Sequence, residues 1–156
     1  MRSGGATMNE RETFVASFRE LHPKFSRMYA QILGRVDLTL PQYALLYQLM
    51  LLGTVSMTEI SGRLEITRPA VTNLTDRLED KKCLRRVPQV EDRRVILLEI
   101  LPKGEKIIAE IQGQSLGLLL KAYDQFDKKE HKIISRFYAT VSKVMDDFLM
   151  RTKNEK

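Results

Sequence analysis

The chain has 156 residues, enough for one compact domain or a small domain with an oligomerisation element, and its 43% hydrophobic and 29% charged residues exclude a disordered protein. Lysine and arginine number 26 against 20 acidic residues, which gives a net charge of +6. That excess indicates either a polyanionic partner or simply a basic surface, and charge alone does not decide between them.

Cysteine content and hydropathy narrow the expected compartment. Cys83 is the single cysteine, so an intramolecular disulfide is excluded and a reducing compartment fits best. No stretch approaches the roughly 18 unbroken apolar residues of a membrane helix, and the first residues lack the apolar core of a signal peptide. We therefore expect a cytoplasmic protein with no membrane partner, in which residues 1–8 are a disordered start or a cloning scar.

The first predicted helix covers residues 9–35. Its apolar residues recur at alternating spacings of four and three, which is typical of a helix that packs along other helices: Phe14, Phe18, Leu21, Phe25, Met28 and Ile32. Pro23 should kink this helix or split it near His22. The pattern suits either a core helix of a monomer or a helix at an interface, and we favour the interface because the C-terminal end repeats the pattern.

The middle of the chain, residues 36–102, has a different pattern. A helix around Tyr43 should end at Gly53, a residue common just after helices. Ser56 with Glu59 predicts a capping box that opens a short second helix. Thr67, followed by Pro69 in the first turn, predicts the start of a third helix that continues to about Lys82. Val71, Leu74 and Leu78 should form the buried face of that helix.

Two strands should follow the third helix. Residues 84–88 and 95–100 have the composition of strands, and the polar residues 89–94 form the tip between them. Two short helices with a tight turn, followed by a hairpin, make a winged helix-turn-helix. We therefore predict a mostly α fold with a small β-hairpin wing (α+β), with the winged helix-turn-helix domain at residues 36–102.

The C-terminal part predicts two further helices. Pro102 suits the first turn of a helix that carries Ile107, Ile111 and Leu118. Asp127 with Glu130 predicts a capping box, and the helix that follows has apolar residues at spacings of three and four: Ile134, Phe137, Val141, Val144 and Phe148. A small chain offers these arms few partners, so residues 9–35 and 103–151 are expected to form a homodimer.

The third helix, residues 67–82, is the predicted recognition helix for double-stranded DNA. An α-helix fits the major groove, where Asn pairs with adenine and Arg with guanine through two hydrogen bonds. The candidate contacts are the residues at its start and on its outward face: Thr67, Arg68, Pro69, Ala70, Thr72, Asn73 and Arg77. The alternative is that these are solvated surface residues, as most exposed polar residues are.

Arginines of the predicted wing support the DNA interpretation. Residues 63–94 contain nine Lys and Arg against six Asp and Glu. An arginine at a hairpin tip can enter a narrow, electronegative minor groove. The candidate wing residues are Arg86, Asp92, Arg93 and Arg94. Asp92 either holds an arginine guanidinium in place or only offsets charge on a solvated turn.

At these residues the chain resembles the MarR family of bacterial and archaeal regulators. The similar segments are LPQYALL at 40–46, TRPAVTNLTDRLE at 67–79, EDRR at 91–94 and LPKG at 101–104. The resemblance covers about 65 residues, 40–104, closely and the flanking helices in layout only. It implies a dimer joined by its terminal helices, one recognition helix per subunit in adjacent major grooves, and Arg94, held by Asp92, as the wing arginine of the minor groove.

The sequence departs from the family pattern at a few positions. Glu65 and Lys82 stand where the family usually has glycine, Ser61 where it has alanine, and Pro102 where it has threonine. A non-glycine residue in a left-handed conformation costs about 1 kcal/mol, so the fold tolerates it. Cys83 stands where the family has an apolar residue, and a buried, inert thiol is the favoured interpretation.

Other classes of function were weighed against DNA binding. The sequence has no phosphate loop, nucleophile elbow or metal-ligand spacing around its two histidines, so we expect no enzyme, catalytic residue, metal or cofactor. The rival interpretation is a winged helix that binds only another protein. The outward face of its third helix should then be apolar, whereas here that face is polar. The resemblance also suggests a repressor released by a small-molecule effector. His22, Met28, Tyr29 and Tyr43 are the candidate pocket residues, although core packing is the favoured interpretation for all of these except His22.

Overall fold

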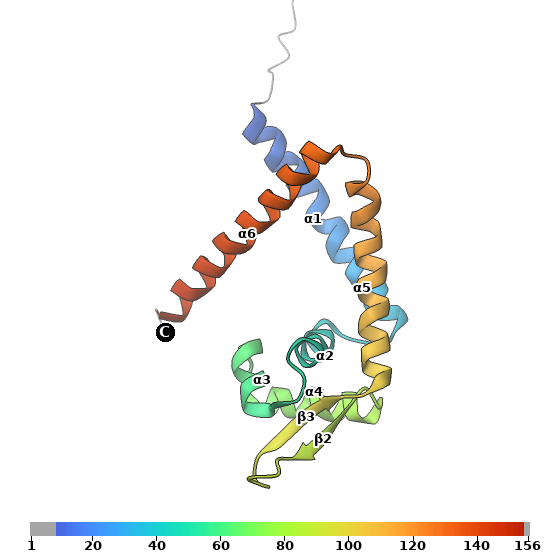
Figure 1. Ribbon diagram of the computed structural model, residues 1–156, viewed down its shortest axis with the longest axis vertical. Coiled ribbons are helices and arrows are strands. Elements are labelled where there is room, and N and C mark those ends of the chain that lie inside the picture. Colours follow the sequence, from blue (N-terminus) through green and yellow to red (C-terminus); the bar gives the residue numbers. More distant parts are fainter. Residues whose placement is uncertain (1–8, 155–156) are drawn as a thin grey trace, which may run out of the picture. The chain divides into compact units, whose positions relative to one another are not determined.

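The computed structural model describes residues 9–154, and the predicted fold class is confirmed. Helices make up most of the described chain, and a small antiparallel sheet accompanies them (Figure 1). The elements are α1 (Glu10–Arg35), α2 (Leu40–Leu52), β1 (Val55–Ser56), α3 (Met57–Leu64), α4 (Arg68–Asp80), β2 (Leu84–Pro88), β3 (Ile96–Ile100), α5 (Pro102–Tyr123) and α6 (Lys128–Asn154). The start predicted at residues 1–8 lies outside the described residues. The chain divides into two compact units, one ending at Ser115 and one beginning at Leu116.

Local capping residues set most helix boundaries where the sequence predicts them. The Thr67 hydroxyl accepts a hydrogen bond from the Ala70 amide at 3.3 Å, and α4 begins at the next residue. At Ser56 the predicted capping box forms only in half. The Ser56 hydroxyl accepts from the Glu59 amide at 3.1 Å, but the Glu59 carboxylate binds Arg63 at 3.0 Å. One turn of helix separates Glu59 from Arg63, and an opposite charge at that spacing competes with the cap.

Helix α1 runs from Glu10 to Arg35 through Pro23 without interruption. The split considered near His22 is therefore wrong. Proline lacks one N–H and so removes one hydrogen bond of the helix, while the turns on either side continue the helix from its Asn9 cap. That cap is a complete capping box, in which Asn9 and Glu12 each accept the other's amide at 2.9 Å.

Within two residues after the ends of α1, α3 and α4, a non-glycine residue takes the left-handed conformation: Asp37 (φ 52°), Glu65 (φ 54°) and Lys82 (φ 58°). Around Lys82 the Cys83 amide donates to the Leu78 carbonyl at 2.9 Å, and the Lys82 amide donates to the Glu79 carbonyl at 2.8 Å. This pair of bonds is the Schellman motif, which satisfies the last carbonyls of a helix. Glu65 and Lys82 thus occupy the turns for which glycine is the usual residue.

The sheet has the strand order β1-β3-β2, and all neighbours are antiparallel. In the hairpin Leu84 pairs with Ile100 and Pro88 with Ile96. On the other edge of β3, Val55 of β1 pairs with Leu98. Strand β1 was not predicted, because two residues are too few to show an alternating pattern.

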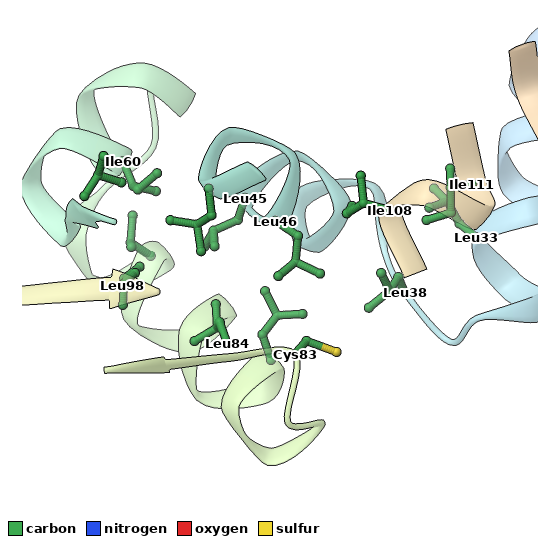
Figure 2. Packing of buried hydrophobic residues seen from close by; sticks show 14 of the residues in the cluster. Leu33, Leu38, Leu45, Leu46, Ile60, Cys83, Leu84, Leu98, Ile108 and Ile111 are labelled. Carbon is green, nitrogen blue, oxygen red and sulfur yellow. The ribbon is translucent and has the colours of Figure 1, made fainter. Parts of the chain in front are cut away.

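The core of the first unit joins the helix-turn-helix to the neighbouring helices. Figure 2 shows Leu45 and Leu46 of α2 packed between Ile60 of α3 and the strand residues Leu84 and Leu98. Ile108 and Ile111 of α5, and Leu33 near the end of α1, extend the same cluster. Helix α4 contributes Val71, Leu78 and the fully buried Thr75. Leu74 packs against the cluster only partly buried, so three of the four residues on this face were predicted.

In the second unit a turn joins the end of α5 to α6. The predicted capping box is confirmed there, since Asp127 accepts from the Glu130 amide at 2.9 Å and its own amide donates to the Glu130 carboxylate at 2.7 Å. The His131 ring stacks on Tyr123 with centroids 3.8 Å apart. His131 Nε2 also lies 2.8 Å from the Tyr123 carbonyl oxygen, so these contacts fix the start of α6.

Large apolar side chains of the terminal helices are exposed in the single chain. Phe18 of α1 is 57% exposed and Val144 of α6 is 62% exposed. Leu21, Leu118 and Met145 are also exposed. None of the helices within residues 9–154 is long and apolar enough to span a membrane.

Candidate nucleic-acid interface

The outward face of α4 carries the predicted contact residues. Arg68, Pro69, Thr72, Asn73 and Arg77 are all exposed, whereas Val71 and Leu78 on the opposite face are fully buried. Ala70 is half-buried, and Thr67 lies just before the helix as its cap. The Thr72 hydroxyl donates to the Arg68 carbonyl at 3.1 Å, and its oxygen still has a lone pair that can accept a hydrogen bond. The buried apolar face of α4 therefore packs against the core, and the opposite face exposes the polar residues to solvent.

The turn before α4 is held by Ser61. Its hydroxyl donates to the Ile66 carbonyl at 2.6 Å, and the Ile66 amide donates to the Ser61 carbonyl at 3.2 Å. Glu65 takes the left-handed conformation between them. The serine in place of the family's alanine thus adds a hydrogen bond across the turn that orients α4.

The tip of the wing is organised by Asp92. Its carboxylate accepts from the main-chain amide of Arg94 at 3.0 Å, and its carbonyl accepts from the Val95 amide at 2.9 Å. We expected Asp92 to hold the Arg94 guanidinium, but the bond in the structure goes to the Arg94 backbone. An aspartate side chain readily bonds a main-chain amide two residues further on. Arg93 and Arg94 are both exposed.

Arg86, the other predicted wing contact, lies against α4. Its Nη2 atom is 2.6 Å from Asp76 Oδ1, and its Nη1 atom contacts the Glu79 carboxylate. Its main-chain amide also donates to Glu79 Oε1 at 3.0 Å. Burial lowers the pKa of the Arg86 guanidinium, but the hydrogen bonds to Asp76 and Glu79 and the negative charges of these two carboxylates together raise it above its ordinary value. Arg86 is therefore a permanently charged link between β2 and α4.

A hollow of about 320 Å³ lies between the start of α4 and the wing. Arg68 and Thr72 line it from α4, and Arg94 lines it from the wing. Ser56, Met57 and Thr58 at the start of α3 complete this side. Arg68 and Thr72, predicted as contacts of the helix, and Arg94, predicted as a contact of the wing, thus border one concave surface. The contribution of residues 56–58 was missed, because only the folded turn between α3 and α4 brings them there.

A second cavity, of about 620 Å³, lies between α1 and α2. Its lining is mainly apolar and includes His22, Tyr29 and Tyr43, three of the four predicted pocket residues. The fourth, Met28, packs against the core instead. Burial, and then the neighbouring Tyr29 and Tyr47, raise the pKa of the Tyr43 phenol, so Tyr43 presents a neutral hydroxyl at physiological pH.

Cys83, in the turn between α4 and β2, is fully buried, as predicted. Burial raises the pKa of its thiol, although Lys103 and Lys81 act in the opposite direction. A thiol reacts as its thiolate, so both burial and the raised pKa keep Cys83 unreactive. Within residues 9–154 no three His, Cys, Asp or Glu side chains come together as potential metal ligands.

The chain is similar to known proteins. The family model described as the MarR family matches residues 38–96. YsmB of Bacillus subtilis, described as an uncharacterized HTH-type transcriptional regulator, is 29% identical over 120 residues, which cover 77% of this chain and 82% of YsmB. Its description as a regulator agrees with the prediction that the chain is not an enzyme.

Solved structures agree on the fold. The crystal structure of YusO from Bacillus subtilis matches with a TM-score of 0.77 and 22% identity, covering 88% of this chain and 99% of that one. A MepR mutant from S. aureus bound to an oligodeoxyribonucleotide matches with a TM-score of 0.67 and 21% identity, covering 86% and 97%. Residues 38–96, which hold most of the winged helix-turn-helix, match the model of the MarR family, and the chain is similar to proteins of that family.

Proposed function

We propose that this chain binds double-stranded DNA as a homodimer and regulates transcription. The observation that carries the proposal is the outward face of α4, where exposed Arg68, Thr72, Asn73 and Arg77 lie opposite a buried apolar face. A relative described as a transcriptional regulator and a solved structure with bound oligodeoxyribonucleotide support it. The protein would act in the cytoplasm of a bacterial or archaeal cell, where the chromosome lies.

The two parts of the interface are proposed to contact different grooves. Helix α4 enters the major groove, where Asn73 can form two hydrogen bonds with adenine and Arg68 with guanine. The wing follows the backbone, so Arg93 and Arg94 meet phosphates or the minor groove. The hollow between α4 and the wing, bordered by Arg68 and Arg94, would receive the sugar-phosphate backbone that separates the two grooves.

The homodimer is proposed from the exposed apolar residues of the terminal helices. Phe18, Leu21, Val144 and Met145 cost free energy as long as water covers them. A second copy would cover them in a two-fold interface formed by residues 9–35 and 103–151. Sedimentation at micromolar concentration should show a dimer, and a stable, well-folded monomer would contradict the proposal.

Two-fold symmetry then sets the form of the DNA site. Recognition helices in successive major grooves place the half-site centres about 10 base pairs, or roughly 34 to 36 Å, apart. Selection from random DNA fragments should therefore yield an imperfect palindrome. Affinity should fall by about 10³ to 10⁵ between 50 and 200 mM salt if the dimer neutralises about 6 to 10 phosphates. Salt-insensitive binding would count against this geometry.

We further propose that the protein is a repressor released by a small molecule in the cavity between α1 and α2. The mainly apolar lining, with the hydroxyl groups of Tyr29 and Tyr43 and the imidazole of His22, suits a small apolar ligand with one or two polar groups. A ligand that weakens DNA binding should raise the melting temperature of the parent protein and lose that effect in His22→Ala. Reporter transcription that rises when the gene is deleted would support repression, and a fall would indicate activation.

The decisive experiment separates base reading from backbone binding. Asn73→Ala should cost about 1 to 3 kcal/mol per subunit on the selected site and relax its preference at one position in each half-site. Arg94→Ala should weaken binding to all sequences and lower the salt slope by about one unit per lost contact. Both side chains are exposed, so both variants should remain folded dimers.

The rival proposal is a winged helix that binds another protein and no DNA. The polar α4 face argues against it, since protein-binding faces are mainly apolar at their centres. Both variants should be measured on the selected site, its point variants and unrelated DNA at two salt concentrations. Binding equal to the parent in every case would exclude the proposed DNA face and favour the rival.

A further inference from the structure

The side chain of Arg86 forms a bridge from the wing to the recognition helix. It is only 27% exposed, and its guanidinium spans two carboxylates one turn of helix apart, Asp76 and Glu79. The Arg86 main-chain amide adds a third hydrogen bond to the bridge, which it donates to Glu79 Oε1 at 3.0 Å. Resting on the proposed DNA-binding function, we propose that Arg86 is a positioning residue, which locks the wing onto the recognition helix and does not itself touch DNA.

The Arg86 bridge holds the hairpin in a fixed orientation relative to α4. The hairpin β2–β3 lies beside α4 (Figure 1). Only Leu97 and Leu98 of β3 pair with β1, so toward its tip the hairpin is a two-stranded ribbon, which is only marginally stable by itself. The rigid, planar guanidinium can bind two carboxylates at once, which a lysine ammonium cannot do with the same geometry. Arg86 therefore fixes the angle between the ribbon and α4, and so the distance between the residues that read each groove.

The bridge also has an electrostatic effect on the interface. Asp76 lies on the outward part of α4 and is 54% exposed, one turn from Thr72 and next to Arg77. A carboxylate there would repel the DNA phosphates. The Arg86 guanidinium at 2.6 Å neutralises it, which lets an acidic residue remain on a DNA-facing helix.

Arg85 provides a matched control on the same strand. Successive side chains of a strand point to opposite faces, and Arg85 pairs with Glu99 across the hairpin instead of with α4. Its side chain is 57% exposed. Arg85→Met and Arg86→Met remove the same charge from adjacent positions, but only Arg86→Met breaks the link to α4.

The first experiment compares these variants in the full chain, with affinity for the selected DNA site measured at several salt concentrations. Arg86→Met should weaken binding by about tenfold or more. Arg85→Met should change affinity by less than about threefold. The loss of Arg86 also uncovers the Asp76 charge, so the salt slope is compared between Asp76→Asn and the double variant Asp76→Asn with Arg86→Met. The two slopes should be equal, because no phosphate contact is lost. A slope lower by about one unit in the double variant would show a direct phosphate contact and overturn the proposal.

Glu79→Gln should change the DNA affinity in opposite directions for the two possible roles of Arg86, direct contact with DNA and positioning of the wing. If Arg86 contacts DNA directly, removal of the Glu79 charge frees the guanidinium and strengthens binding. If Arg86 positions the wing, Glu79→Gln weakens binding even though it removes a negative charge. The double variant Arg86→Met with Glu79→Gln should then bind no worse than Arg86→Met alone, since both changes break one link. Additive losses would overturn the proposal.

Hydrogen exchange of the free protein keeps the bridge testable without DNA. Amides of residues 84–100 should exchange faster in Arg86→Met and in Glu79→Gln than in the parent, and Arg85→Met should exchange like the parent. Arg86→Lys should restore only part of the protection. If the parent binds no DNA, the proposed function fails, whereas unchanged exchange in both Arg86→Met and Glu79→Gln would refute the bridge itself.

Discussion

Gly104, in the first turn of α5, lies directly against the main-chain carbonyl of Cys83, the residue just before strand β2. A Cβ at position 104 would overlap the Cys83 carbonyl oxygen and lie 2.9 Å from Cγ1 of Ile100. The same carbonyl oxygen accepts a hydrogen bond from the Leu101 amide at 2.9 Å. The start of α5 is therefore packed backbone to backbone against the chain between α4 and β2, which explains the glycine at position 104.

Gly104→Ala should destabilise the protein by about 1 to 3 kcal/mol, because a backbone carbonyl cannot move aside as a flexible side chain would. Gly113 of the same helix has no atom within 4 Å of an added Cβ. Gly113→Ala should therefore stabilise by about 0.5 to 1 kcal/mol through its better helix propensity. Thermal unfolding at equal protein concentration checks both, and equal effects would contradict the close packing.

Thr75→Val should stabilise the protein by about 1 to 2 kcal/mol. The Thr75 hydroxyl is buried without a hydrogen-bond partner among the described residues, and valine has nearly the same shape without the polar group. Thr72→Val, one turn away and exposed, is the control: it should leave stability nearly unchanged and alter DNA binding. Denaturant titration measures the free energy of unfolding, and a Thr75→Val variant less stable than the parent would refute the prediction.

Lys82→Gly should raise stability by about 1 kcal/mol, because Lys82 has a φ of 58°, a conformation that glycine adopts without steric cost. Lys81→Gly tests the neighbouring position. Lys81 has a φ of −76° and binds Asp37, so glycine there should destabilise. For a protein of this size, 1 kcal/mol corresponds to about 2 to 4 °C in melting temperature. Opposite signs at the two adjacent positions are the expected result.

The ion pair between Lys81 and Asp37 should make stability depend on pH at the acid end. Lys81 Nζ lies 2.6 Å from Asp37 Oδ2, and this hydrogen bond and charge lower the pKa of the Asp37 carboxyl. A group whose pKa is lowered in the folded state stabilises it above its unfolded pKa of about 4 and loses that effect as pH falls through the folded pKa. Asp37→Asn keeps the left-handed turn, so it should lower stability at neutral pH and flatten the loss below about pH 4. An unchanged acid limb of the unfolding curve would show that the pair contributes nothing.

Most of the fold was determined by local features of the sequence. The cap at Thr67, the capping box at Asp127 and the glycine after α2 each act over a few residues, so their effect is readable without a structure. The burial pattern of α4 follows from helical periodicity, which assigned Asn73 to the exposed face and Leu78 to the core. The resemblance to the MarR family likewise rests on short segments of sequence, at 40–46, 67–79, 91–94 and 101–104.

The tertiary structure decided what depends on distant segments. Arg86 pairs with Asp76 ten residues away and with Glu79 seven away, and nothing in the sequence distinguishes that pairing from a contact with DNA. The two-residue strand β1 exists because β3 offers it a partner. The close approach of Gly104 to Cys83, and the burial of the Thr75 hydroxyl, follow from packing between α4, the sheet and α5. Local propensity fixes where helices begin and which face is apolar, whereas the partner of each polar group is set only when the chain is packed.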